Sequence, residues 1–133
     1  MTVFVDTSAL LPILNSDDRD YPKAYKIWQN LAAEQARVIT SSYVLVESTA
    51  LIQNRLGMAA VRSFQEGFVP LLQTVWVNAE LHNMGMAALL TADRRRLSLV
   101  DCVSFVICQQ RQVESVFAFD QHFSEQGFAV LAA

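Results

Sequence analysis

The sequence predicts an α/β domain in which a parallel sheet is covered by helices on both faces. Short apolar runs rich in Val and Phe alternate along the chain with longer stretches of helical spacing, which is the pattern of repeated strand–helix–strand units. Glycine and proline are scarce, at 4 and 3 residues, so we expect short connections. The 133 residues suffice for one ordinary core. We therefore expect a single domain over residues 1–133.

The first half of the chain contains two expected strands and three expected helices. Residues 2–5 are a buried strand, and a short helix over 8–14 follows with Thr7 or Ser8 as its N-cap. A second helix starts near Pro22, a residue suited to a first turn. A brief strand over 37–40 then leads into a helix over 41–57 that ends at a glycine.

The second half repeats the alternation. We expect a helix over 58–69, a strand over 72–77, and helices over 79–92 and 98–112. The last strands lie at 115–119 and 128–132, which brings the predicted sheet to four or five strands.

Composition excludes several classes of protein. Hydrophobic residues make up 53% and charged residues 17%, which excludes a disordered chain. No apolar stretch approaches the roughly 18 uncharged residues that cross a bilayer, and the first apolar run lacks a basic flank. We therefore expect a cytoplasmic protein without a membrane partner. Cys102 and Cys108 lack metal-site spacing and are expected to be buried thiols. The net charge of −3 argues against a broad basic surface for duplex DNA.

Four acidic residues stand out because apolar residues flank them. Asp6 and Asp120 each close an apolar strand, and Glu47 and Asp101 lie within apolar helical stretches. The carboxyl ends of parallel strands form the edge where ligands bind in open α/β sheets. Most other acids, Glu125 among them, lie in polar or terminal contexts and are predicted to be ordinary surface.

Each of the four acids also has a structural interpretation. The alternatives are a helix cap at Asp6, an ion pair of Glu47 with Arg55 or Arg62, a capping box of Asp101 with Ser98, and a turn at Asp120. If the four carboxylates converge, they repel one another, and positive charge is needed to keep them ionised. Oxygen ligands without paired histidines or thiolates favour Mg²⁺ or Mn²⁺ over Zn²⁺. Such a pocket is typical of enzymes that cleave phosphodiesters.

Four segments together resemble the acidic motifs of PIN-domain ribonucleases. They are "VFVDTSALL", the Glu of "TSSYVLVES", "LSLVDCVSF" and "VFAFDQHF", in the order of that family and over the whole chain. The strongest resemblance is to the VapC-type toxins of VapBC toxin–antitoxin pairs. It implies a PIN-like three-layer α/β/α sandwich, an Mg²⁺- or Mn²⁺-dependent endoribonuclease that leaves 5′-phosphate and 3′-hydroxyl ends, a homodimer, and a cognate antitoxin as partner.

The resemblance also implies roles for individual residues. Asp6, Glu47, Asp101 and Asp120 are carried over as the catalytic, metal-binding acids. The hydroxyl that orders the site is matched by Thr7, with Ser8 as the less favoured choice. The chain departs from the family at His122, where many members carry a second acid. For His122 we leave open a contact to substrate phosphate, metal ligation, or packing.

Two further groups have both a functional and a structural interpretation. Arg94, Arg95 and Arg96 precede the helix that carries Asp101, and they either contact the RNA backbone or form a solvated loop. Tyr21, Tyr25 and Trp28 share one helix face. This face either packs in the core or a dimer, or receives an apolar segment of the antitoxin.

Other functions are less well supported. A non-catalytic PIN-like interaction module would be expected to have lost some of the four acids. A phosphohydrolase with Asp6 as its nucleophile would more naturally carry Asp-x-Asp, whereas this chain has Asp6, Thr7 and Ser8. A structure-specific DNA nuclease would need extra length to hold duplex arms.

Overall fold

The computed structural model describes residues 1–131, and its centre is a parallel sheet of four strands in the order β3-β2-β1-β4. The central strand β1 pairs with β2 through Val3↔Val38 and with β4 through Phe4↔Val116. The four strands are β1 (Thr2–Val5), β2 (Arg37–Ser41), β3 (Gln73–Val75) and β4 (Ser115–Phe117). Because all strands run in the same direction, their carboxyl ends lie at one edge of the sheet.

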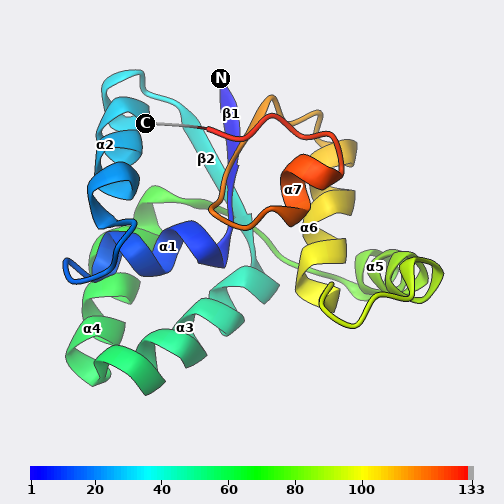
Figure 1. Ribbon diagram of the computed structural model, residues 1–133, viewed down its shortest axis with the longest axis horizontal. Helices are drawn as coiled ribbons and strands as arrows, with labels where there is room; N and C mark the ends of the chain where they lie inside the picture. The colour runs from blue at the N-terminus through cyan, green and yellow to red at the C-terminus, as the bar shows by residue number, and fades with distance from the viewer. Residues whose placement is uncertain (132–133) are drawn as a thin grey trace.

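Helices cover both faces of the sheet, as the sequence predicts. The chain moves from β1 to β2 to β3 in one direction across the sheet and then returns to β4. Because such crossovers are right-handed, the reversal places the later helices on the opposite face. Figure 1 shows α1 to α4 on one side of the strands and α5 to α7 on the other. The helices are α1 (Thr7–Leu14), α2 (Tyr21–Ala33), α3 (Ser42–Leu56), α4 (Met58–Ser63), α5 (Ala79–Ala92), α6 (Leu99–Gln110) and α7 (His122–Glu125).

The core lies where these helices meet the sheet. Val3, Phe4 and Val5 of β1 are fully buried, as expected for a central parallel strand covered on both faces. Every residue from Asp101 to Cys108 of α6 is also buried. Burial raises the pKa of the Cys108 thiol to about 12, so this cysteine is an inert core residue, as predicted. None of the described helices is long and apolar enough to cross a membrane.

Four predicted elements differ from the structure. The strand over 115–119 ends at Phe117. The helix over 58–69 is α-helical only to Ser63 and continues as a π-helical turn and a 3₁₀ turn to Leu71. The strand over 72–77 is limited to Gln73–Val75, because its partner β2 ends at Ser41 and the Val77 N–H donates to the Ser42 hydroxyl instead. The strand over 128–132 is reduced to a single bridge between Val116 and Val130, and Ala132 lies outside the described residues.

On the aromatic face of α2, one ring packs in the core and another is partly exposed to solvent. Trp28 packs on Phe68 with ring centroids 4.4 Å apart, so this ring belongs to the fold. Tyr21 and Tyr25 stack on each other at 5.6 Å, and Tyr25 remains 44% exposed. The core interpretation therefore holds for Trp28 but not for Tyr25.

The packing of α5 against α6 depends on Gly85. A Cβ atom at this position would lie 2.4 Å from Cγ2 of Val103. The two helices therefore lie closer together here than a residue with a side chain would allow. We expect Gly85→Ala to lower the free energy of unfolding by about 1 to 2 kcal/mol, because overpacking outweighs the gain in helix propensity. Urea unfolding measures the change. Gly67→Ala is the control, since no heavy atom lies within 4 Å of its added Cβ.

A double-mutant cycle tests the cause of that loss. In a Val103→Ala background, Gly85→Ala should be close to neutral, because the clashing methyl group is gone. Equal destabilisation in both backgrounds would show that the contact with Val103 is not responsible.

Candidate active site

Asp6 follows β1 directly and caps the first turn of α1. Its Oδ2 atom accepts hydrogen bonds from the Ser8 backbone N–H at 3.1 Å and from the Ser8 hydroxyl at 2.7 Å. Its own N–H donates to the Phe117 carbonyl of β4 at 3.0 Å, and the Thr40 hydroxyl of β2 donates to the Val5 carbonyl at 2.9 Å. Both neighbouring strands thus hold Asp6 in place, and only 4% of the residue is exposed.

The two hydroxyl residues after Asp6 have different contacts. The Ser8 hydroxyl donates to Asp6 and accepts a hydrogen bond from the Phe119 N–H at 3.0 Å. Thr7 instead accepts a hydrogen bond from Ser48 of α3 at 3.1 Å. The hydroxyl that contacts Asp6 therefore belongs to Ser8, not to the favoured Thr7. The predicted N-cap is also wrong, because Asp6 occupies that position.

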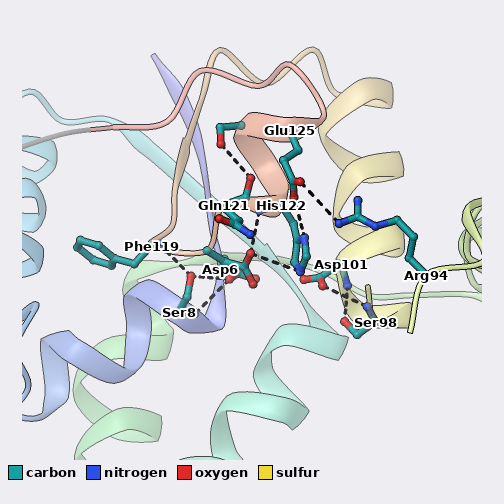
Figure 2. Close-up of polar contacts among 11 residues, drawn as sticks. Asp6, Ser8, Arg94, Ser98, Asp101, Phe119, Gln121, His122 and Glu125 are labelled. Carbon is teal, nitrogen blue, oxygen red and sulfur yellow. Dashed lines mark hydrogen bonds and ion pairs between the residues drawn. The ribbon is translucent and has the colours of Figure 1, made fainter. Parts of the chain in front are cut away.

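Asp101 lies in the first turn of α6 and forms a capping box with Ser98. The Asp101 N–H donates to the Ser98 hydroxyl at 3.0 Å, and the Ser98 N–H donates to Oδ2 of Asp101 at 3.2 Å. Asp101 is 8% exposed. The structural interpretation of this acid is therefore correct, and it leaves the carboxylate facing the same edge of the sheet as Asp6 (Figure 2).

Asp120 follows β4 and turns the chain into α7. Its Oδ1 atom accepts a hydrogen bond from the His122 N–H at 2.8 Å, so the predicted turn is present. The same loop brings His122 toward the acids. One ligand atom each from Asp101, Asp120 and His122 lies within 4.8 Å of the other two, which is compact enough for a metal ion to bridge them.

Glu47 approaches the site from α3 and is half-buried. The neighbouring Ser48 donates to Thr7 at 3.1 Å and fixes this turn of α3 against α1. Among the described residues, Glu47 forms no ion pair with Arg55 or Arg62, and both arginines are exposed. The ion-pair interpretation of Glu47 is therefore not supported.

One cleft contains all four predicted acids. Its volume is about 260 Å³, and it lies at the carboxyl edge of the sheet. The lining residues come from α1, α3, the start of α6 and the loop after β4, and they are Asp6, Thr7, Ser8, Leu11, Glu47, Leu51, Arg55, Ser98, Asp101 and Asp120. The fold thus assembles acids that are far apart in the sequence, and only part of the set is buried.

The acids influence one another electrostatically. The pKa of Asp6 is raised from an ordinary 3.8 to about 6. Burial is the largest cause, the hydrogen bonds from Ser8 oppose it, and the negative charges of Asp101 and Glu47 add to it. Burial also raises the pKa of Asp101, with an added contribution from Asp120. A cation in the cleft would relieve this repulsion. The oxygen-rich donor set fits a hard divalent ion such as Mg²⁺ or Mn²⁺.

The arginines before α6 are exposed, and one of them has a partner that the sequence did not predict. Nη2 of Arg94 lies 3.6 Å from Oε2 of Glu125, whose Oε1 lies 3.0 Å from Nδ1 of His122 (Figure 2). The sequence predicts Glu125 to be ordinary surface, whereas the structure gives it these two contacts. The signal for its role was its spacing of three residues from His122, which puts both on one helix face.

Comparison with known proteins identifies the family of this chain. The PIN domain family matches residues 3–129. The 23S rRNA-specific endonuclease VapC20 of Mycobacterium tuberculosis is 32% identical over 127 residues, which cover 95% of each sequence. The chain belongs to the PIN-domain family. It is similar along nearly its whole length to a VapC endonuclease, so the predicted family and nuclease class are confirmed.

Solved structures show the same fold. The crystal structure of Mycobacterium tuberculosis VapC20, a Sarcin-Ricin loop cleaving toxin, matches with a TM-score of 0.88 at 29% identity, covering 98% of this chain and 99% of its own. The structure of VapBC2 from Rickettsia felis, bound to a promoter DNA fragment, matches with a TM-score of 0.71 at 12% identity, covering 98% of each chain. The structure of FitAcB from Neisseria gonorrhoeae matches with a TM-score of 0.68 at 14% identity, covering 97% of this chain and 96% of its own. The predicted fold class is confirmed.

The raised pKa of Asp6 predicts the pH dependence of the metal-free protein. Between pH 3.8 and about 6 the folded chain binds more protons at Asp6 than the unfolded chain, so its contribution destabilises the fold as the pH rises. We expect Asp6→Asn, which keeps an oxygen for the Ser8 cap, to raise the free energy of unfolding at pH 7.5 by roughly 2 to 3 kcal/mol. The gain should vanish below pH 4.

Urea unfolding in EDTA at pH 4, 6 and 7.5 measures this difference. Asp17→Asn, at an exposed acid, is the control and should change little at any pH. A variant Asp6→Asn that unfolds at lower urea than wild type at pH 7.5 would mean that the Asp6 carboxylate stabilises the fold.

Proposed function

We propose that the protein is a divalent-metal-dependent endoribonuclease toxin that cleaves the sarcin–ricin loop of 23S rRNA in the cytoplasm. The observation that carries this proposal is the cleft at the carboxyl edge of the sheet, which contains Asp6, Glu47, Asp101 and Asp120 together. The substrate is inferred from VapC20, since the two chains share 32% identity over 95% of their lengths and the folds agree at a TM-score of 0.88.

Asp6, Glu47, Asp101 and Asp120 are the residues that would hold Mg²⁺ or Mn²⁺ in the cleft. A bound ion supplies the positive charge that activates water and stabilises the negative charge developing on a phosphodiester. The chain itself supplies rigidity. The Ser8 hydroxyl and N–H fix Asp6, and the capping box fixes Asp101. Carboxylates held this way need no rearrangement when substrate arrives.

A cognate antitoxin and a second copy of the chain are the protein partners that we propose. The antitoxin follows from the resemblance to the VapC-type toxins of VapBC pairs, and the fold is shared with the structures of VapBC2 and FitAcB. The stacked Tyr21 and Tyr25 rings on α2 are a surface suited to an apolar antitoxin segment, because Tyr25 is 44% exposed. Trp28 is excluded from that surface by its packing on Phe68.

Cleavage of ribosomal RNA tests the proposed function. Purified protein should cut 23S rRNA within the sarcin–ricin loop in intact ribosomes with Mg²⁺ or Mn²⁺, and EDTA should abolish the cut. Asp101→Asn should lower the rate by at least about 100-fold, since removing a metal ligand takes away several kcal/mol of transition-state stabilisation. Primer extension locates the cut, and Glu114→Gln, an exposed acid at the other end of β4, is the matched control.

Each outcome of this experiment has a distinct meaning. A metal-dependent cut elsewhere in RNA would retain the nuclease and overturn the substrate. Full activity of Asp101→Asn would overturn the assignment of the acids. An absence of cleavage, together with an absence of metal binding by calorimetry, would favour a non-catalytic interaction module.

Arg95 and Arg96 are proposed to contact the RNA backbone beside the cleft, because both are exposed and lie in the loop just before Ser98, the N-cap of α6 that lines the cleft. We expect the double change Arg95→Gln, Arg96→Gln to raise KM about tenfold and to reduce the slope of log KM against log salt by about 1 to 2, with kcat little changed. Arg111→Gln, at the opposite end of α6, is the control. An unchanged salt slope would assign the two arginines to a solvated loop.

A further inference from the structure

Four side chains form a continuous polar series from the surface into the candidate site. Nη2 of Arg94 lies 3.6 Å from Oε2 of Glu125, and Oε1 of Glu125 lies 3.0 Å from Nδ1 of His122. Nε2 of His122 then lies 3.7 Å from Oδ1 of Asp120. Figure 2 shows Glu125 between Arg94 and His122, with the His122 ring lying close to Asp101. The inner end of the series is the group of ligand atoms within 4.8 Å of one another.

The contact with Glu125 decides how the His122 ring faces the acids. An ionised carboxylate only accepts hydrogen bonds, so Nδ1 of His122 carries the hydrogen in the 3.0 Å contact. In neutral imidazole the other nitrogen, Nε2, then holds a lone pair. That nitrogen faces Asp101 and Asp120, and the His122 side chain is only 12% exposed. A nitrogen lone pair and two carboxylates with ligand atoms within 4.8 Å of one another form a donor set that a divalent cation can occupy.

Neither of the other interpretations of His122 explains this arrangement. A ring that merely packs needs no carboxylate on its outer nitrogen. His82 shows the contrast, since its Nδ1 contacts the Tyr43 hydroxyl and its ring lies edge-on to the Tyr43 ring. A contact to substrate phosphate would leave Nε2 available to the substrate. The observed Nε2 atom lies beside Asp120 instead.

We propose that His122 is a nitrogen ligand of the divalent ion held by Asp101 and Asp120, and that Glu125, held by Arg94, positions the His122 ring. The inference rests on the proposed metal-dependent function and names a ligand at the position where the sequence departs from the acidic pattern. A carboxylate that orients a metal-binding histidine through its other ring nitrogen is a recurrent arrangement. Because imidazole is a poorer ligand for Mg²⁺ than carboxylate, His122 shifts the preference of the site toward Mn²⁺.

Electron paramagnetic resonance of bound Mn²⁺ tests the ligand directly. We expect nitrogen-14 coupling in the wild-type spectrum that disappears in His122→Ala, with Mn²⁺ affinity about 10- to 100-fold weaker by calorimetry. The chain has only 2 histidines, so His82→Ala is a complete control and should keep the coupling. His122→Asp guards against a folding defect, because it should lose the coupling, keep Mn²⁺ binding and raise the affinity for Mg²⁺ relative to Mn²⁺.

The positioning role of Glu125 has a separate readout. Glu125→Gln should keep the nitrogen coupling but weaken Mn²⁺ binding about tenfold, because the neutral amide holds the ring less firmly. Glu114→Gln, an exposed acid far from the cleft, should leave both unchanged. Affinity equal to wild type in Glu125→Gln would overturn the role of Glu125.

The results also separate this inference from the proposed function. Wild-type protein that binds Mn²⁺ without nitrogen coupling, or a His122→Ala variant that binds Mn²⁺ as tightly as wild type, would overturn the role of His122 and leave the acidic site intact. Wild-type protein that binds no Mn²⁺ would overturn both.

Discussion

Mutual repulsion among carboxylates is the constraint on which the candidate site depends. Asp6 and Asp101 are almost completely buried, and Glu47 and Asp120 border the same cleft. A group of this kind is unfavourable by itself, and burial together with neighbouring charges raises the pKa of Asp6 to about 6. The rest of the fold must hold these side chains where they would not gather spontaneously. Such a site is stable only with compensating donors or a cation.

Local hydrogen bonds provide part of that compensation. Asp6 caps α1, Asp101 belongs to the capping box of α6, and Asp120 holds the turn into α7. In each case backbone N–H groups donate to the carboxylate and lower its energy while fixing its direction. The structural and functional interpretations of these acids are therefore not alternatives, because the bonds that cap the helices also aim the carboxylates at the cleft.

Much of this arrangement was predictable, and the errors have identifiable causes. Alternating apolar runs predicted the strands and helices because they reflect burial on a sheet covered on both faces. The strand Gln73–Val75 is shorter than the apolar run that predicts it, because its partner β2 ends at Ser41, opposite Val75. The family resemblance favours Thr7 over Ser8 as the hydroxyl beside Asp6, but neighbouring side chains in one helical turn point in different directions. Ser8 therefore contacts Asp6, and Thr7 contacts Ser48. The role of Glu125 follows only partly from its spacing to His122, because its second partner, Arg94, reaches it only in the folded chain.

The sequence by itself determined the class of the fold and the placement of the four acids, two at strand ends and two within helices, because these follow from local patterns of polarity. Only the tertiary structure decided which carboxylates meet, which hydroxyl supports Asp6, and which way the His122 ring faces. The physical reason is that these contacts join segments up to 111 residues apart, as in the hydrogen bond from Phe119 to Ser8. Distances of that kind are set by strand order and helix packing, not by any local pattern.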